Sequence, residues 1–156
     1  MSVLKEGMHA PDFSAQASSG EVISLKNLKG KKVVLYFYPK DDTPGCTVEA
    51  CGFRDGIKKI KAAGAVVLGV SPYGVDSHLQ FISKFKLPFL LLSDTDKKIC
   101  RDYGVWVEKS MYGKKYMGVA RTTFVLGEAG KIEKIFEKVQ PEGHPDEVLE
   151  CLKALE

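Results

Sequence analysis

The sequence predicts an α/β fold, because segments typical of strands and of helices alternate along the chain. Residues 33–38 and 65–70 are apolar and rich in β-branched residues, a pattern that favours buried central strands. Between them, residues 46–63 contain the helix-forming residues Lys, Ile and Ala, and this helix is expected to stop at Gly64. The alternation therefore predicts a sheet flanked by helices.

The same alternation continues after the second strand. Residues 76–86 carry apolar side chains at helical spacing, and Pro88 ends this predicted helix. A third strand is expected at residues 89–92. A short helix at residues 95–103, closed by Gly104, follows it.

Two strands and a helix are expected in the last part of the chain. The strands span about residues 116–126 and 131–139, and the glycine-containing segment 127–130 predicts a hairpin between them. Pro145 suits the first turn of a last helix at about residues 145–155. Because the sequence contains no repeats, low-complexity segments or linkers, residues 1–156 are expected to form a single domain.

Composition and charge exclude several classes of protein. The chain is 44% hydrophobic and 28% charged, as globular proteins are, and its 23 basic and 20 acidic residues are interleaved, so no nucleic-acid partner is expected. No apolar run approaches the ~20 residues of a membrane span, and the N-terminus lacks the apolar core of a signal peptide. Four cysteines are too few for a disulfide framework, so we expect a cytoplasmic protein without membrane contact.

The segment from Pro39 to Cys51 carries the strongest indication of chemistry. Thr43 is a good N-cap and Pro44 a good first helical residue, which places Cys46 in the first turn of the helix. The free N–H groups and the dipole of a first turn stabilise a thiolate, the nucleophilic form of cysteine. Acidic neighbours oppose this effect, so strong activation requires a basic partner from elsewhere in the chain.

The spacing between Cys46 and Cys51 makes a mechanical prediction. Five helical residues give about 7.5 Å of rise and about 140° of rotation, so the two Cα atoms lie roughly 8 to 9 Å apart. A disulfide requires less than about 7 Å, so the two cysteines cannot bond within one intact helix. If they do bond, the helix must unwind locally, and the flanking Gly45 and Gly52 lower the cost of that change.

Other interpretations of the cysteines and histidines stay open from the residues alone. A single cysteine is more typical of an inert buried thiol, and we expect that role for Cys100 and Cys151. A zinc site is disfavoured, because no second ligand pair follows the C-x4-C spacing at a suitable interval. A protease-like Cys–His pair is a weaker alternative, since His9, His78 and His144 are all distant from the cysteines in sequence.

The residues around Cys46 resemble the active-site signature of the peroxiredoxin family, P-x-x-x-T-x-x-C, which Pro39, Thr43 and Cys46 match. Arg121, between apolar neighbours, resembles the arginine that this family draws from a distant strand. Cys51, five positions after Cys46, resembles the second cysteine of the Q-type subgroup. Softer similarities run almost from end to end of the chain.

The resemblance implies a thioredoxin-like fold with a central mixed β-sheet, and reduction of hydrogen peroxide or organic hydroperoxides. Cys46 would be the peroxidatic cysteine and become a sulfenic acid. Cys51 would be the resolving cysteine and form an intramolecular disulfide, which a thioredoxin- or glutaredoxin-like donor would reduce. Sulfur carries this chemistry, so no metal, haem or flavin cofactor is implied. The Q-type likeness also points to a monomer or weak dimer.

The resemblance also gives roles to the neighbouring residues. The Thr43 hydroxyl would orient the thiolate and the peroxide, and Pro39 would shield the sulfur from water. Arg121 is always charged and would stabilise the thiolate and the charge that develops on the leaving oxygen. Glu49 resembles a position that helps to hold the arginine.

Three other functions compete with the peroxidase. A thiol-disulfide oxidoreductase of this fold favours C-x-x-C rather than the C-x4-C found here. A non-catalytic redox sensor would use the same helix unwinding as a signal. A structural zinc module is the least favoured of the three.

Overall fold

The computed structural model describes residues 4–155, so the first residues of the N-terminal segment considered for a signal peptide lie outside it. Seven strands form one sheet in the order β2-β1-β5-β4-β3-β8-β9. Their bounds are β1 (Ser14–Ala17), β2 (Val22–Ser24), β3 (Lys32–Phe37), β4 (Ala65–Ser71), β5 (Leu90–Ser93), β8 (Thr122–Leu126) and β9 (Ile132–Phe136). The three central strands β3, β4 and β5 are parallel, and the outer pairs are antiparallel, so the sheet is mixed as predicted.

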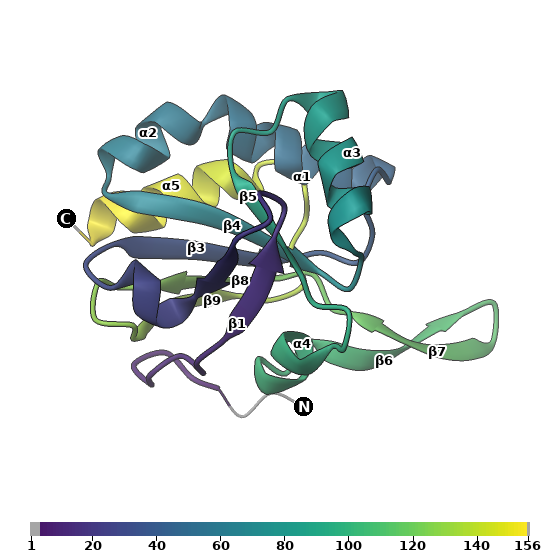
Figure 1. Cartoon of the computed structure of the whole chain (residues 1–156). Helices are drawn as coiled ribbons and strands as arrows, with labels where there is room; N and C mark the ends of the chain where they lie inside the picture. The colour runs from purple at the N-terminus through teal and green to yellow at the C-terminus, as the bar shows by residue number, and fades with distance from the viewer. Residues whose placement is uncertain (1–3, 156) are drawn as a thin grey trace.

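Helices cover both faces of this sheet (Figure 1). They are η1 (Leu25–Leu28), α1 (Pro44–Asp55), α2 (Ile57–Ala62), α3 (Val75–Phe85), α4 (Lys98–Asp102) and α5 (His144–Ala154). Apolar side chains of α1, α2, α3 and α5 pack in the core on one face, and those of α4 and the N-terminal segment pack on the other.

Strand β3 is the centre of the core because both of its faces are apolar. Val33, Leu35 and Phe37 point into one core, and Val34 and Tyr36 point into the other. Apolar side chains on both faces are typical of a buried central strand, as the sequence predicts for this segment. Its last residue leads directly into the loop before α1.

Two predicted elements are corrected by the structure. The helix expected at residues 46–63 is divided into α1 and α2 at Gly56. The strand expected at residues 116–126 is interrupted at Ala120 and Arg121 and forms parts of two sheets. Its first part is β7 (Lys114–Val119), which pairs with β6 (Trp106–Met111) in a separate hairpin that projects from the body of the protein (Figure 1).

The remaining differences concern short segments. The sequence did not predict β1, β2 or η1. The short helix expected at residues 95–103 is reduced to α4. The hairpin at residues 127–130 is confirmed, since β8 and β9 pair antiparallel and Gly127 donates its N–H to the carbonyl of Lys131. Within residues 4–155, no helix is long and apolar enough to cross a membrane.

Candidate active site

Cys46 lies where the carboxyl end of β3 meets the amino end of α1. Thr43 is the N-cap residue and Pro44 begins the helix, as the sequence predicted, so Cys46 is its third residue. The Cys46 side chain is buried, with 1% of its surface exposed. The Thr43 hydroxyl does not cap the helix; it donates a hydrogen bond to the carbonyl of Lys40 at 3.0 Å and so closes the loop before the helix.

Arg121 reaches the Cys46 sulfur from the junction between β7 and β8. Its Nη2 donates to Sγ of Cys46 at 3.2 Å. Strand register explains this approach, because Thr122 lies opposite Phe37 at the end of β3, next to the start of α1. Gly45 leaves room for the guanidinium, since a Cβ there would lie 3.3 Å from Nη2. The basic partner that the local sequence lacked is thus supplied by a residue 75 positions away.

Glu49 binds the other side of the same guanidinium. Nη1 of Arg121 donates to Oε1 of Glu49 at 2.8 Å, and the Glu49 side chain is fully buried. Burial raises the pKa of Glu49 to about 7, even though the Arg121 charge lowers it. Its second oxygen and the buried Tyr36 hydroxyl have no hydrogen-bond partner among residues 4–155, which leaves the ionised carboxylate incompletely stabilised.

The other two residues singled out from the sequence lie close in the chain but make no such contact. Cys51 is half-buried in the same continuous helix as Cys46, and both are free thiols. Pro39 is half-buried and lies in the loop between β3 and α1. Their resolving and shielding roles stay predictions.

Lys109 is a charged neighbour that the sequence did not indicate. It lies half-buried on β6, in the hairpin that was not predicted. Burial, and after it the charge of Arg121, lowers the pKa of Lys109, whereas a charge on Cys46 raises it. The lysine therefore lies within electrostatic reach of the site.

The other two cysteines have raised pKa values, and two of the three histidines contact residues other than cysteine. Burial raises the pKa of the Cys100 thiol, and the Asp94 carboxylate adds to that effect. Burial also raises the pKa of Cys151. His78 contacts Asp41, and His144 contacts Thr123 and Glu147, rather than a cysteine. Across residues 4–155, no group of three or more His, Cys, Asp or Glu side chains is arranged to hold a metal ion.

Comparisons with known proteins agree with this architecture. The model of the AhpC/TSA family matches residues 7–135. A bcp protein of Coxiella burnetii is 53% identical over 146 residues, covering 94% of this chain and 97% of the relative. The peroxiredoxin Bcp of Bacillus subtilis is 45% identical over 147 residues and covers 94% of each chain.

Solved structures extend the likeness to three dimensions. The bacterioferritin comigratory protein of Xanthomonas campestris superposes with a TM-score of 0.91 at 39% identity, covering 97% of this chain and 99% of that one. A mutant of Xylella fastidiosa PrxQ superposes with a TM-score of 0.94 at 34% identity, covering 99% of both. The chain belongs to the AhpC/TSA family, and within it to the Bcp or peroxiredoxin Q kind of peroxiredoxin. It is therefore a thiol-dependent peroxidase with a thioredoxin-like fold, as its resemblance implied.

Proposed function

We propose that the protein reduces hydrogen peroxide and alkyl hydroperoxides at Cys46 and resolves the product through Cys51. The observation that carries this proposal is the 3.2 Å contact between the Arg121 guanidinium and the buried sulfur of Cys46. A buried cation beside a sulfur favours its thiolate form. The bacterioferritin comigratory protein of Xanthomonas campestris has alkyl peroxide reduction activity, which supports organic hydroperoxides as substrates.

In the first step, the Cys46 thiolate attacks the terminal oxygen of the peroxide. A sulfur–oxygen bond forms and the oxygen–oxygen bond breaks, so that Cys46 becomes a sulfenic acid. The leaving alkoxide or hydroxide takes up a proton and departs as an alcohol or water. Arg121 stabilises the negative charge on the leaving oxygen. The first N–H groups of an α-helix have no partner within the helix, and those of α1 can serve as further donors.

In the second step, the Cys51 thiol attacks the sulfur of the sulfenic acid, and water leaves as the disulfide forms. Both cysteines belong to the continuous helix α1, so the helix must unwind before the sulfurs meet. Gly52 packs tightly on α5, since a Cβ there would lie 2.7 Å from Cγ of Pro145. We therefore expect unwinding in the first turns of α1, while the helix from Gly52 onward stays on α5.

A dithiol protein of the thioredoxin or glutaredoxin kind returns the enzyme to its starting state. Thiol–disulfide exchange reduces the Cys46–Cys51 bond and oxidises the donor, so electrons balance over the cycle. The Q-type likeness supports a monomer or weak dimer.

Stopped-flow oxidation by hydrogen peroxide tests these assignments with matched serine variants. Cys46→Ser is expected to abolish the reaction. Cys51→Ser is expected to consume one equivalent and stop at the sulfenic acid. A Cys46→Ser protein that reacts as fast as wild type would overturn the mechanism and bring the sensor and oxidoreductase functions forward.

Hydrogen exchange tests the unwinding separately. We expect amide protection across residues 45–51 to fall when the wild-type protein is oxidised, while α5 stays protected. Equal protection in the reduced and disulfide forms would contradict the unwinding step but leave the role of Cys46 intact.

A further inference from the structure

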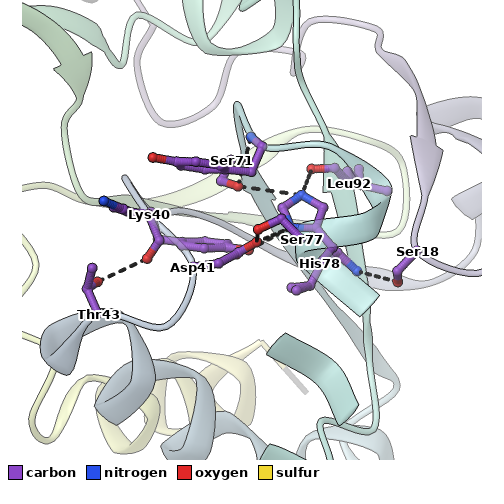
Figure 2. Close-up of polar contacts among 11 residues, drawn as sticks. Ser18, Lys40, Asp41, Thr43, Ser71, Ser77, His78 and Leu92 are labelled. Atoms are coloured by element: carbon purple, nitrogen blue, oxygen red, sulfur yellow. Dashed lines mark hydrogen bonds and ion pairs between the residues drawn. The ribbon is translucent and has the colours of Figure 1, made fainter. Parts of the chain in front are cut away.

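A buried polar cluster lies beneath the loop that leads from β3 to the active-site helix (Figure 2). The Asp41 carboxylate of this loop is its centre and accepts three hydrogen bonds. Oδ2 accepts from Nδ1 of His78 at 2.8 Å and from the Ser77 hydroxyl at 2.6 Å, and Oδ1 accepts from the Tyr38 hydroxyl at 2.5 Å. His78 and Ser77 both belong to α3, so the cluster joins the active-site loop to that helix.

Both ring nitrogens of His78 lie close to oxygens that accept hydrogen bonds. Nδ1 faces the Asp41 carboxylate, and Nε2 lies 3.2 Å from the carbonyl oxygen of Leu92 on β5. Carboxylate and carbonyl oxygens only accept hydrogen bonds, so this geometry favours a hydrogen on each ring nitrogen. The Ser71 hydroxyl on β4 is more distant from Nε2, at 3.5 Å. The His78 side chain is fully buried and 5% of the Asp41 side chain is exposed, so the contact between them is shielded from water.

The remaining polar groups of the cluster support an ionised Asp41. Burial alone would raise the pKa of the Asp41 carboxyl, but the hydrogen bonds from His78, Ser77 and Tyr38 outweigh it and hold that pKa below its ordinary value. Burial, and after it the neighbouring Tyr36 and Asp41, raises the pKa of Tyr38 well above its ordinary value. Its hydroxyl therefore stays protonated and acts as a donor.

The loop that contains Asp41 has a strained backbone and therefore depends on contacts that fix it. Asp42 has a φ of +56°, a left-handed conformation that is costly for a residue other than glycine. A loop with that conformation persists only where its surroundings fix it. Asp41 precedes the strained residue, and Thr43 and the first turn of α1 follow it. The surface pair of Asp42 with Lys84 is a second link to α3, at 2.8 Å, but 46% and 59% of these two side chains are exposed.

We propose that His78 is a positioning residue for peroxide reduction, acting through its buried ion pair with Asp41. The pair anchors the loop 39–43 to α3 and to the sheet, and it fixes the segment that leads into the helix of Cys46. His78 touches neither sulfur nor peroxide and acts only through Asp41. This inference rests on the proposed role of Cys46 and adds a residue to the machinery that serves it.

The proposal predicts different effects on the two chemical steps. Attack by Cys46 on peroxide requires the loop and α1 in their folded arrangement, so loosening the loop slows oxidation. Disulfide formation requires α1 to unwind, so loosening the loop does not slow resolution. A general loss of folding would slow both steps and so would not produce this separation.

The test measures Cys46 oxidation by hydrogen peroxide with His78→Asn, which keeps a donor to Asp41 but removes the positive charge. Placing the substitution in a Cys51→Ser background isolates the oxidation step, and Cys46→Ser shows that the signal comes from Cys46. We expect oxidation to slow by about tenfold or more, as small misplacements of reacting groups do. Resolution, measured with Cys51 intact, should be at least as fast as in wild type.

Lys84→Ala is the matched control, because it breaks an ion pair of equal length between the same loop and the same helix. Both partners of that pair are exposed, so we expect less than about twofold change in oxidation. Equal oxidation rates in wild type and His78→Asn, or equal slowing by Lys84→Ala, would overturn the proposal. If only Cys46→Ser abolishes the oxidation signal, the proposed function of Cys46 stands whether or not the proposal for His78 does.

Two further measurements test the ion pair itself. In Asp41→Asn/His78→Asn no buried charge is left unpaired, so we expect oxidation no slower than in the slower single variant. If the rate loss in the double variant equals the product of the losses in the two single variants, the residues act independently and the proposal is overturned. Nitrogen-15 NMR of the wild-type protein tests the ion pair even if His78→Asn does not fold. It should show hydrogens on both ring nitrogens, and a neutral ring would overturn the proposed pair.

Discussion

Cys46 and Cys100 occupy the same position in their helices but have opposite electrostatic surroundings. Each is the third residue of its helix, α1 for Cys46 and α4 for Cys100, and each is buried, with 1% and 0% of the residue exposed. The sulfur of Cys46 faces the Arg121 guanidinium at 3.2 Å. Cys100 faces the buried carboxylate of Asp94, which accepts from its backbone N–H at 2.8 Å.

The difference shows that position at the start of a helix does not by itself make a thiol reactive. Burial raises the pKa of Cys100, and the Asp94 carboxylate raises it further, so that thiol stays protonated and inert. Cys46 is equally buried, but its sulfur contacts the Arg121 guanidinium rather than a carboxylate. The charge that a distant segment brings to the sulfur is therefore the main difference between the two sites, and it supports the proposed role of Cys46.

The largest expected effect comes from removing the cation. We expect Arg121→Met to slow oxidation of Cys46 by hydrogen peroxide about 10² to 10³-fold, because the thiolate and the leaving oxygen both lose a charged donor. Arg121→Lys should recover only part of the rate, since an ammonium group cannot donate to Sγ and Glu49 in the same fork-shaped geometry. Stopped-flow kinetics with each variant provides the measurement. A methionine variant within about twofold of wild type would contradict the account.

The next effect concerns the carboxyl that shares the guanidinium. The folded protein raises the pKa of Glu49 from 4.5 to about 7, so the folded state holds this proton more tightly than the unfolded state. Its contribution to stability is therefore complete below about pH 4.5 and is lost as the pH rises through about 7. The two pKa values correspond to a loss on the order of 3 kcal/mol across that window.

Glu49→Gln should remove this part of the pH dependence, because an amide does not titrate. Urea unfolding of both proteins at about pH 5 and about pH 8 checks it through the free energy of unfolding. The variant should lose less stability than wild type between the two conditions. An equal loss in both proteins would assign the pH dependence to other groups.

The smallest effect is expected at the structural cysteine. Cys100→Ala removes a buried sulfur and should lower the free energy of unfolding by on the order of 1 kcal/mol. Peroxide turnover should be unchanged, because the inert thiol takes no part in the reaction. Urea titrations measure the free energy of unfolding, and peroxide assays on the same variant measure turnover. A variant with normal stability but lost turnover would show that Cys100 takes part in the chemistry.

Local sequence was sufficient for the elements that hold Cys46. Thr43 and Pro44 predicted the start of α1 correctly, although the Thr43 side chain makes no capping hydrogen bond, and β3 was evident from its apolar residues. The break at Gly56 was missed because helix-forming residues continue on both sides of it. The projecting β6–β7 hairpin was missed because much of it is exposed, and it carries no buried alternation from which a strand is recognised.

The contacts across the site depend on the tertiary structure. Family resemblance indicated Arg121, but only the pairing of β8 with β3 brings it to Cys46. The Asp41–His78 pair joins residues 37 positions apart, and neither has a sequence pattern that announces the other. Separations of this kind leave no trace in helical or strand periodicity, so such pairs are found only once the fold is known.

Chemical mapping of the oxidised sulfur tests the central claim most directly. The Cys51→Ser protein is treated with one equivalent of hydrogen peroxide in the presence of a sulfenic-acid reagent, and the labelled peptides are identified by mass spectrometry. The account predicts label on Cys46 and none on Cys100, although both thiols are buried at the same helical position. Equal labelling of the two, or label on Cys100 alone, would contradict the claim that the facing charge selects the reactive cysteine.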